Sequence, residues 1–392
     1  MTGTVSPGVE VLLGEPCRFL GSDRVGLITN QTGVTSDLTS TVDALHRSPD
    51  VDLRALFGPE HGARGDLQDA LPAEYHIDDS TGLPVHSLFG DSLRPTPEML
   101  EGLDSLVFDI QDVGCRFYTY PSTMAYAMEA AAEDGLSFIV LDRPDPINGV
   151  AVEGNLLRPG FSSFVGFHPV PIRHGMTIGE LASLINEEIC AELSVVKMRG
   201  WSRGMWFDET GLPWVQPSPN IPTLDTATVY PGTCLFEGVN VSEGRGTTRP
   251  FEYVGAPWID GGRWAEELNA QGLAGVRFRA CSFIPTFDKH VGERCGGVQV
   301  HVTDREGLQP VEAGLHMLQT LLSLHEDELE WLPPEADGLM HFDMLTGTDA
   351  LRGDLMGGRP VGEIVGGWVE ELEGFMELRR GHLLYPEDKE FD

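Results

Sequence analysis

Short apolar runs alternate with helix-like segments through the first half of the chain, and this alternation restricts its fold more than any other feature. The runs cover residues 25–29, 53–57, 106–110 and 138–141, with helical patterns between them at 38–47, 97–103 and 123–134. Buried strands separated by helices are typical of a parallel sheet that is covered by helices on both faces. We therefore predict an α/β fold built on a Rossmann-like parallel sheet.

The second half of the chain follows other patterns. Thr177 and Glu180 form a capping box that predicts the start of a further helix. Residues 201–257 are rich in Pro, Gly, Asn and Thr with little periodicity, and their tryptophans favour an ordered functional stretch over disorder. Strand-like runs at 276–279 and 298–302 precede helices at about 310–324 and 361–379. We predict a Rossmann-like catalytic domain over residues 1–245 and a smaller α/β domain over residues 246–392.

Charge and hydropathy exclude several classes of partner. The 392 residues carry a formal net charge of −35 and include three lysines, so the surface repels nucleic acid and anionic membranes. No stretch approaches the roughly 20 apolar residues of a membrane span. The first 15 residues lack the basic and apolar regions of a secretory signal. We expect no nucleic-acid partner, no membrane insertion, and a cytoplasmic location unless a leader was removed.

Several familiar catalytic motifs are missing. The six cysteines show no C-x-x-C pair, so we interpret them as mostly buried free thiols and predict no metal site. There is no G-x-G-x-x-G turn, P-loop, H-E-x-x-H motif or G-x-S-x-G elbow. Dinucleotide binding, nucleotide hydrolysis, zincin-type proteolysis and esterase chemistry therefore lack support, and we expect no cofactor.

Polar side chains instead gather directly after three of the predicted strands. The segments 57–65, 108–120 and 141–149 each contain at least one carboxylate and one arginine. Because the loops after parallel strands converge at one edge of an open α/β sheet, we expect a site there. The residues expected to contribute are Glu60, His61, Arg64, Asp109, Asp112, Arg116, Tyr118, Asp142 and Arg143.

Some of these residues also have a purely structural interpretation. Asp109 could cap a helix or pair with Arg116. Asp142 and Arg143 could form an ion pair at the strand end, and His61 could be a core histidine that is satisfied by backbone groups. The sequence leaves these alternatives open.

Glu60 lies between Pro59 and His61 in a glycine-flanked loop, where a charged side chain has no packing task. A glycosidase needs one carboxylic acid to protonate the leaving oxygen, and a second group to stabilise or attack the anomeric carbon. We interpret Glu60 as the acid. The loop residues that could supply the second group are Asp109, Asp112, Glu237 and Glu243.

The irregular stretch supplies residues suited to a sugar that bears hydroxyls, an amide and a carboxylate. Arg245 or Arg249 could bind the carboxylate through a two-pronged contact. The alternative is a charged loop held together by Glu–Arg pairs. The other residues expected to bind the sugar are His174, Asn220 and Asn240.

Nine longer segments carry a family resemblance: GLITNQTGV (26–34), LFGPEHGARGD (56–66), TGLPVHSLFG (81–90), FDIQDVGCRFYTY (108–120), VLDRPDPING (140–149), PIRHGMTIGEL (171–181), PSPNIPT (217–223), VYPGTCLFEGVNVSEGRGTTRPFE (229–252) and PTFDKHVGERCGGVQVHVTD (285–304). Together they resemble the NamZ-type exo-β-N-acetylmuramidases. The resemblance implies a Rossmann-like domain, a smaller α/β domain and an active site in the cleft between them. It also implies hydrolysis of a terminal N-acetylmuramic acid without a cofactor, with Glu60 of the PEHG motif as the acid/base.

One segment departs from the family pattern. Family members resemble A-G-E-K-V followed by a tyrosine and an aspartate, whereas this chain has DALPA (69–73) and then EYHID (74–78). The family glutamate falls at Leu71, and the tyrosine at His76 or Tyr75. We expect this departure to affect the choice of substrate more than the class of reaction.

We predict a glycoside hydrolase that releases terminal non-reducing N-acetylmuramic acid from peptidoglycan-derived sugars or muropeptides. One alternative is a sugar-binding protein of the same fold without turnover, which would release no chromophore from an aryl N-acetylmuramide. The other is a metal-dependent amidase that acts on the peptide side of muropeptides, which a chelator would inhibit.

Overall fold

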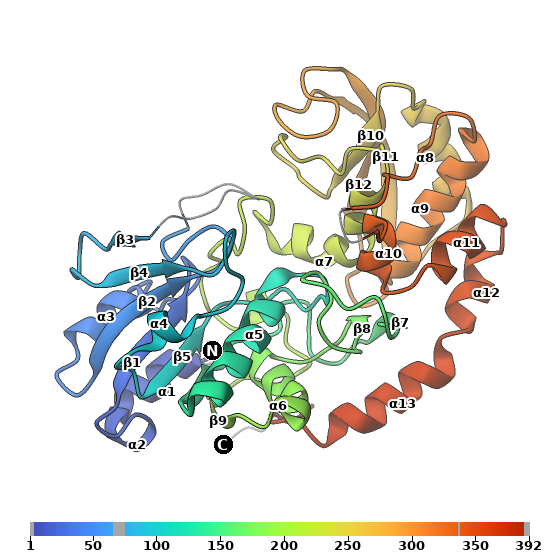
Figure 1. Cartoon of the computed structure of the whole chain (residues 1–392). Coiled ribbons are helices and arrows are strands. Elements are labelled where there is room, and N and C mark those ends of the chain that lie inside the picture. The colour runs from blue at the N-terminus through green and yellow to red at the C-terminus, as the bar shows by residue number, and fades with distance from the viewer. Residues whose placement is uncertain (1–3, 66–74, 336–337, 388–392) are drawn as a thin grey trace.

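The computed structural model describes residues 4–65, 75–335 and 338–387 (Figure 1). The departure at residues 69–78 is therefore described only from Tyr75 onward, and Leu71 lies outside the described residues. Two sheets dominate the fold, and helices cover them.

The larger sheet has seven strands in the order β3-β4-β2-β1-β5-β6-β9. Neighbouring strands pair in parallel, except that the two-residue strand β3 is antiparallel to β4. Without β3, the order is that of a doubly wound Rossmann sheet, and the predicted fold class is confirmed. The strand bounds are β1 (Arg24–Thr29), β2 (Asp52–Gly58), β3 (His76–Ile77), β4 (Pro84–Ser87), β5 (Ser105–Asp109), β6 (Ser137–Leu141) and β9 (Glu192–Val196).

Successive side chains of each strand point to opposite faces of the sheet, and helices bury both faces. On one face, Val25 and Leu27 of β1 belong to a core shared with α1 (Gly8–Gly14) and α3 (Thr41–Arg47). On the other face, Ile28 lies in the core formed with α5 and α6. The remaining helical bounds of this unit are α2 (Pro16–Phe19), α4 (Pro97–Leu100), α5 (Thr119–Asp134) and α6 (Ile178–Ile189).

Helix boundaries match the sequence signals in part. The predicted capping box of α6 is present, with Thr177 accepting from the Glu180 amide. Gly135 ends α5 in a left-handed conformation, as predicted. That helix begins at Thr119, four residues before the predicted start, because Pro121 fits within a first helical turn.

The smaller unit contains an antiparallel three-stranded sheet in the order β10-β12-β11. Its bounds are β10 (Tyr253–Ala256), β11 (Val276–Phe283) and β12 (Cys295–Val302), with helices α8 (Gly261–Ala270), α9 (Pro310–Leu324), α10 (His341–Thr346) and α11 (Ala350–Met356). The helix predicted over residues 361–379 is divided into α12 (Val361–Gly366) and α13 (Val369–Arg380) at a glycine pair. The division of the chain at residues 245 and 246 stays a prediction.

Helix α13 returns to the larger unit (Figure 1). At its end, Arg379 donates to the backbone carbonyls of His174 and Gly175. Tyr385 then donates its phenol hydrogen to the buried carboxylate of Asp142. The short ribbon of β7 (Glu153–Leu156) and β8 (Pro171–Arg173) also contacts α13, since the Leu156 amide donates to Glu371. The C-terminal segment therefore ties the two units together.

The stretch of residues 201–257, expected to be irregular, contains a ten-residue helix, α7 (Leu224–Thr233). The short 3-10 helices η1 (Phe207–Glu209) and η2 (Cys234–Gly238) lie in the same stretch. Residues 226–233 of α7 are all buried. A helix that is surrounded by protein on every side has no polar face, so the amphipathic pattern that would have predicted it is absent.

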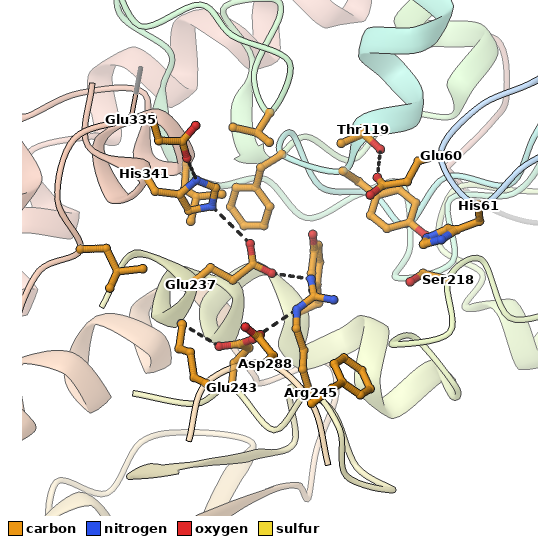
Figure 2. Close-up of a pocket in the computed structure, with 18 of the residues that line it drawn as sticks. Glu60, His61, Thr119, Ser218, Glu237, Glu243, Arg245, Asp288, Glu335 and His341 are labelled. Carbon is orange, nitrogen blue, oxygen red and sulfur yellow. Dashed lines mark hydrogen bonds and ion pairs between the residues drawn. The ribbon is translucent and has the colours of Figure 1, made fainter. Parts of the chain in front are cut away.

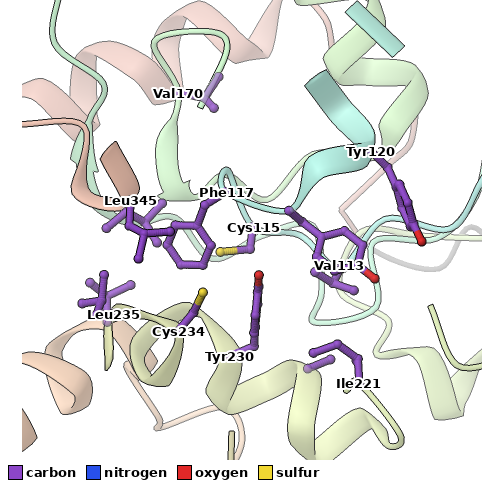
Figure 3. Close-up of a cluster of buried hydrophobic side chains, with 14 of the residues drawn as sticks. Val113, Cys115, Phe117, Tyr120, Val170, Ile221, Tyr230, Cys234, Leu235 and Leu345 are labelled. Atoms are coloured by element: carbon purple, nitrogen blue, oxygen red, sulfur yellow. The ribbon is translucent and has the colours of Figure 1, made fainter. Parts of the chain in front are cut away.

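A shared apolar core joins the two units below the sheet edge (Figure 3). Phe117, which precedes α5, packs edge-on against Tyr230 of α7, with ring centroids 5.4 Å apart.

All six cysteines are free thiols, and three of them (Cys115, Cys234 and Cys295) are buried, so the expectation that most are buried holds for half. Among the described residues, no helix combines the length and apolar character needed to cross a bilayer.

Candidate active site

A pocket of about 1090 Å³ opens where the C-terminal edge of the larger sheet meets the smaller unit (Figure 2). Five of the predicted site residues line it: Glu60, His61, Tyr118, Glu243 and Arg245. Glu237, considered for the second acidic group, also lines it. The other lining residues used below are Phe117, Thr119, Tyr120, Ser218, Tyr230, Phe287, Asp288, Lys289, Pro333, Pro334, Glu335 and His341.

Glu60 reaches the pocket from a sharply bent loop that follows β2. The Gly62 amide donates to the Pro59 carbonyl at 2.9 Å, and His61 adopts the left-handed region with φ 75°. Non-glycine residues rarely occupy that region, so the surrounding structure must hold the turn. The half-buried carboxylate of Glu60 accepts a hydrogen bond of 3.0 Å from the Thr119 hydroxyl at the first residue of α5. The turn and the helix start together fix this carboxylate in the pocket.

Buried aromatic rings form the wall beside Glu60. Tyr118 lies edge-on to Tyr120, with ring centroids 4.9 Å apart, and Tyr230 lies edge-on to Phe251 at 4.8 Å. Burial raises the pKa of the Tyr118 phenol, and the charges of Tyr120, Asp112 and Glu60 add to the effect. The wall therefore stays neutral and apolar at physiological pH, which strengthens electrostatic interactions in the pocket.

The facing wall holds a chain of alternating charges (Figure 2). Arg245 donates from Nη2 to Glu237 at 2.6 Å, and its Nε lies 3.2 Å from Oε1 of Glu243. Lys289 donates to the other oxygen of Glu243 at 3.0 Å. Burial raises the pKa of Glu243 to about 7, although Lys289 opposes the shift. Burial also lowers the pKa of Arg245, against the opposing charges of Asp288 and Glu60.

His341 extends this charge chain toward solvent. Its Nε2 lies 3.4 Å from Glu237, and its Nδ1 lies 2.8 Å from Glu335. Burial would lower the pKa of His341, but the contacts with Glu237 and Glu335 outweigh it and raise the pKa. The wall thus combines Arg245, Lys289 and a readily protonated histidine, which suits an anionic ligand. Within the described ranges, no group of three or more His, Cys, Asp or Glu residues is arranged to hold a metal ion.

Asp109 and Arg143 lie at the sheet edge but not in the pocket. Arg143 donates from Nε to one oxygen of Asp109 at 2.6 Å and from Nη2 to the other at 2.9 Å. Thr41 donates to the same carboxylate, which is fully buried. This pair ties β5 to the loop after β6. Both residues therefore have structural roles, but they pair with each other and not with Arg116 and Asp142, the partners considered from the sequence.

Asp112, Arg116 and His174 are buried below the pocket. Asp112 accepts from the Gly114 amide at 2.9 Å and lies 3.5 Å from Nε2 of His174. Arg116 donates to three backbone carbonyls, including that of Leu345 in α10. Burial lowers the pKa of Arg116 to about 10. The structure does not bring these three residues to the pocket surface.

Asp142 and Arg64 have structural partners as well. Asp142 accepts from the Gly179 amide and the Thr177 hydroxyl, both at 2.8 Å, at the start of α6. Arg64 makes a two-pronged contact with Asp78, with both distances at 3.0 Å. Neither residue lines the pocket.

Three predicted sugar-binding residues of the irregular stretch also lie outside the pocket. Asn240 accepts from the Glu330 amide at 2.9 Å, and Arg249 pairs with Glu252 at 3.1 Å. The Asn220 amide donates to the hydroxyl of Ser218, which does line the pocket. Asn220 is thus close to the pocket, whereas Asn240 and Arg249 hold loops.

The residues that sequence reasoning missed divide into two groups. Thr119, Tyr120 and Lys289 stand inside the FYTY and PTFDKH motifs, which could have indicated them. Glu335 and His341 come after the last of the nine segments quoted from the sequence, which ends at residue 304, and only the fold brings them to the pocket. No sequence signal indicated these two residues.

The pH dependence of stability follows from four buried carboxyl groups whose pKa burial raises to about 7: Asp142, Asp145, Glu153 and Glu243. The unfolded chain releases these protons near pH 4, so their contribution to stability is complete below that pH and is lost as the pH rises through 7. We expect the melting temperature, measured by calorimetry, to fall by several degrees between pH 5 and pH 8 (an order-of-magnitude estimate).

Replacing Glu153 with glutamine provides the control for this prediction. It removes one of the four carboxyl groups, at a position outside the pocket, and should make the melting temperature depend less on pH. Three histidines have pKa values that burial lowers, and they oppose the trend near pH 6.5: His86, His168 and His316. A melting temperature that rises across this range would show that the carboxyl groups do not dominate.

Comparison with known protein families matches nearly the whole chain. The model described as "Exo-beta-N-acetylmuramidase NamZ, N-terminal" matches residues 25–225, and the corresponding C-terminal model matches residues 228–385. A curated relative, the peptidoglycan beta-N-acetylmuramidase NamZ of Bacillus subtilis (strain 168), is 50% identical over 383 residues, which span 97% of this chain and 91% of the relative.

Two solved structures are similar along their whole length. Both are crystal structures of DUF1343 family proteins from Bacteroides fragilis NCTC 9343. One is 40% identical with a TM-score of 0.90, covering 97% of this chain and 99% of that one. The other is 30% identical with a TM-score of 0.79, covering 98% of this chain and 100% of that one.

Proposed function

Since the chain belongs to the NamZ exo-β-N-acetylmuramidase family, we propose that it removes terminal N-acetylmuramic acid from peptidoglycan-derived sugars with Glu60 as the general acid. The observation that carries this assignment is the position of Glu60. Its carboxylate lies in a large pocket between an apolar wall and a charged wall, and it accepts a hydrogen bond from Thr119. The other carboxylates considered from the sheet edge are committed to internal partners.

Glu60 would protonate the glycosidic oxygen as the bond to the anomeric carbon breaks. A positioned acid of this kind typically contributes about 10²- to 10⁴-fold to the rate. The neutral ring of Tyr118 beside it excludes water from the reacting bond. Thr119 keeps the carboxyl group in place before and after the proton is transferred.

The charged wall would hold the sugar. N-acetylmuramic acid carries a carboxylate on its lactyl group, and Arg245 is the guanidinium among the described pocket-lining residues. Lys289 largely balances Glu243, while His341 shares Glu237 with Arg245. With His341 protonated, three cations lie beside these two inner carboxylates, while Asp288, which also lines the pocket, is exposed to solvent. Glu335 is about half exposed, so water screens its charge.

Of the four candidates for the second acidic group, Glu237 and Glu243 line the pocket. The Glu243 side chain is only 1% exposed, and both its oxygens face cations. We assign it the role of positioning Arg245 and Lys289. Glu237 is more accessible, and it would stabilise the positive charge that develops at the anomeric carbon.

Hydrolysis of the disaccharide N-acetylmuramyl-β-1,4-N-acetylglucosamine tests the function. We expect the purified protein to release free N-acetylmuramic acid and N-acetylglucosamine, detected by mass spectrometry, with and without a chelator. A protein that binds this disaccharide but leaves it intact would be a sugar-binding module instead. Loss of activity with the chelator would contradict the metal-free mechanism.

A further inference from the structure

The loop between β11 and β12 presents an aromatic ring at the mouth of the pocket. Most lining residues are buried or half-buried, and the exposed ones mark where the pocket meets solvent. They lie in two short segments, residues 287–288 on one side and 333–335 on the other. Among the described lining residues, Phe287 is the exposed aromatic one, with 40% of its surface accessible.

The backbone around Phe287 is firmly held. Thr286 donates to the Gly246 carbonyl through both its amide, at 3.0 Å, and its hydroxyl, at 2.8 Å. A Cβ atom at Gly246 would lie 2.6 Å from the Phe287 nitrogen, so the two loops are in direct backbone contact. Since Gly246 follows Arg245 in the chain, this contact fixes Phe287 relative to the charged wall.

The conformation of the next residues adds to this rigidity. Asp288 and His290 both adopt positive φ angles, 67° and 57°, on either side of Lys289. Lys289 turns inward and donates to Glu243 and to the carbonyls of Phe236 and Val241. Left-handed residues persist where the surrounding structure over-determines them, and such residues cluster at functional sites. The loop therefore keeps a large apolar side chain in solvent, at a position set by buried ionic contacts.

We propose that Phe287 is the platform for the leaving sugar, the one on the far side of the cleaved bond. This inference rests on the proposed function. A terminal sugar that enters the pocket leaves the rest of the glycan at the mouth, where Phe287 lies. The axial C–H groups of N-acetylglucosamine form an apolar face that packs on an aromatic ring. Phe287 thus selects for a sugar as the leaving group and does not take part in the chemistry.

Steady-state kinetics on the N-acetylmuramyl-N-acetylglucosamine disaccharide test this role. An aromatic contact is worth about 0.5–1.5 kcal/mol, so Phe287→Ala should raise KM by about 2- to 12-fold. The contact exists before and during bond cleavage, so kcat should change little. Phe287→Trp should restore a low KM. Val291→Ala is the matched control, because Val291 is an exposed apolar residue of the same loop that does not line the pocket.

Inhibition by free N-acetylmuramic acid separates the two sides of the bond. This product occupies the inner part of the pocket, so its inhibition constant should be the same for Phe287→Ala and the unmodified protein. An unchanged KM in Phe287→Ala, or an equal loss of affinity for the free product, would overturn the assignment. If the unmodified protein fails to cleave the disaccharide, the proposed function itself fails; normal cleavage with an unaffected variant refutes only the role of Phe287.

Discussion

Replacing Glu60 with glutamine is expected to lower kcat on the disaccharide by about 10²-fold or more without unfolding the protein. The amide has the same size and can still accept the hydrogen bond from Thr119, but it cannot donate a proton to the leaving oxygen. Initial rates of N-acetylmuramic acid release measure the effect, and thermal unfolding monitors the fold. Glu101→Gln, an exposed glutamate that does not line the pocket, should behave like the unmodified protein.

The dependence on the leaving group distinguishes a proton donor from a binding residue. A nitrophenyl N-acetylmuramide leaves as a stable phenolate and needs little protonation, whereas the sugar hydroxyl of the disaccharide needs it strongly. Glu60→Gln should therefore lose much more activity on the disaccharide than on the aryl substrate. An equal loss on both substrates would assign Glu60 to binding or positioning, and near-normal activity on the disaccharide would remove it from the mechanism.

The sequence predicts the larger sheet well because its strands are buried on both faces. The apolar runs at 25–29, 53–57, 106–110 and 138–141 overlap β1, β2, β5 and β6. Each end of a run lies within one residue of the corresponding end of its strand. Such strands consist almost entirely of apolar residues, so their limits are visible in composition alone. Burial has the opposite effect on helix α7, because the burial of residues 226–233 removes the polar face that marks a surface helix.

The candidate site is less predictable because a position after a strand fixes the edge of the sheet but not the direction of the side chain. Glu60 turns into the pocket. Asp109, the last residue of β5, turns inward and pairs with Arg143. Asp142, which follows β6, turns inward and accepts a hydrogen bond at the start of α6. Buried polar groups must be satisfied, and strand ends offer both kinds of partner. Which partner a carboxylate meets is decided by tertiary contacts.

Part of the pocket is formed by chain segments whose position next to the sheet edge no sequence pattern indicates. Glu237 and His341 are 104 positions apart in sequence, and their contact depends on how α10 packs against η2. No local pattern encodes such a contact, since it arises from the packing of elements distant in the chain. The resemblance to a known family could indicate Glu60 because the PEHG motif is contiguous.

Replacing Arg245 with methionine is expected to abolish the preference for N-acetylmuramic acid over N-acetylglucosamine. The two sugars differ by the lactyl carboxylate, and a buried charge-assisted contact to such a group is worth about 2–5 kcal/mol, or roughly 30-fold or more in affinity. Calorimetric binding of each free sugar to the protein measures the preference directly. The variant should also unfold at a lower temperature, because Glu237 and Glu243 lose their shared cation.

Arg249→Met is the matched control, because the sequence offers both arginines equally and the structure separates them. Arg249 is 44% exposed, pairs with Glu252 and does not line the pocket, so its loss should leave the preference intact. Comparing a ratio of affinities removes the general effect of destabilisation, which weakens both sugars together. If Arg245→Met retains the preference, the carboxylate is bound elsewhere, and Arg245 serves only to balance Glu237 and Glu243. If Arg249→Met loses the preference, the substrate extends beyond the pocket assigned to it, toward the loop that holds Glu252.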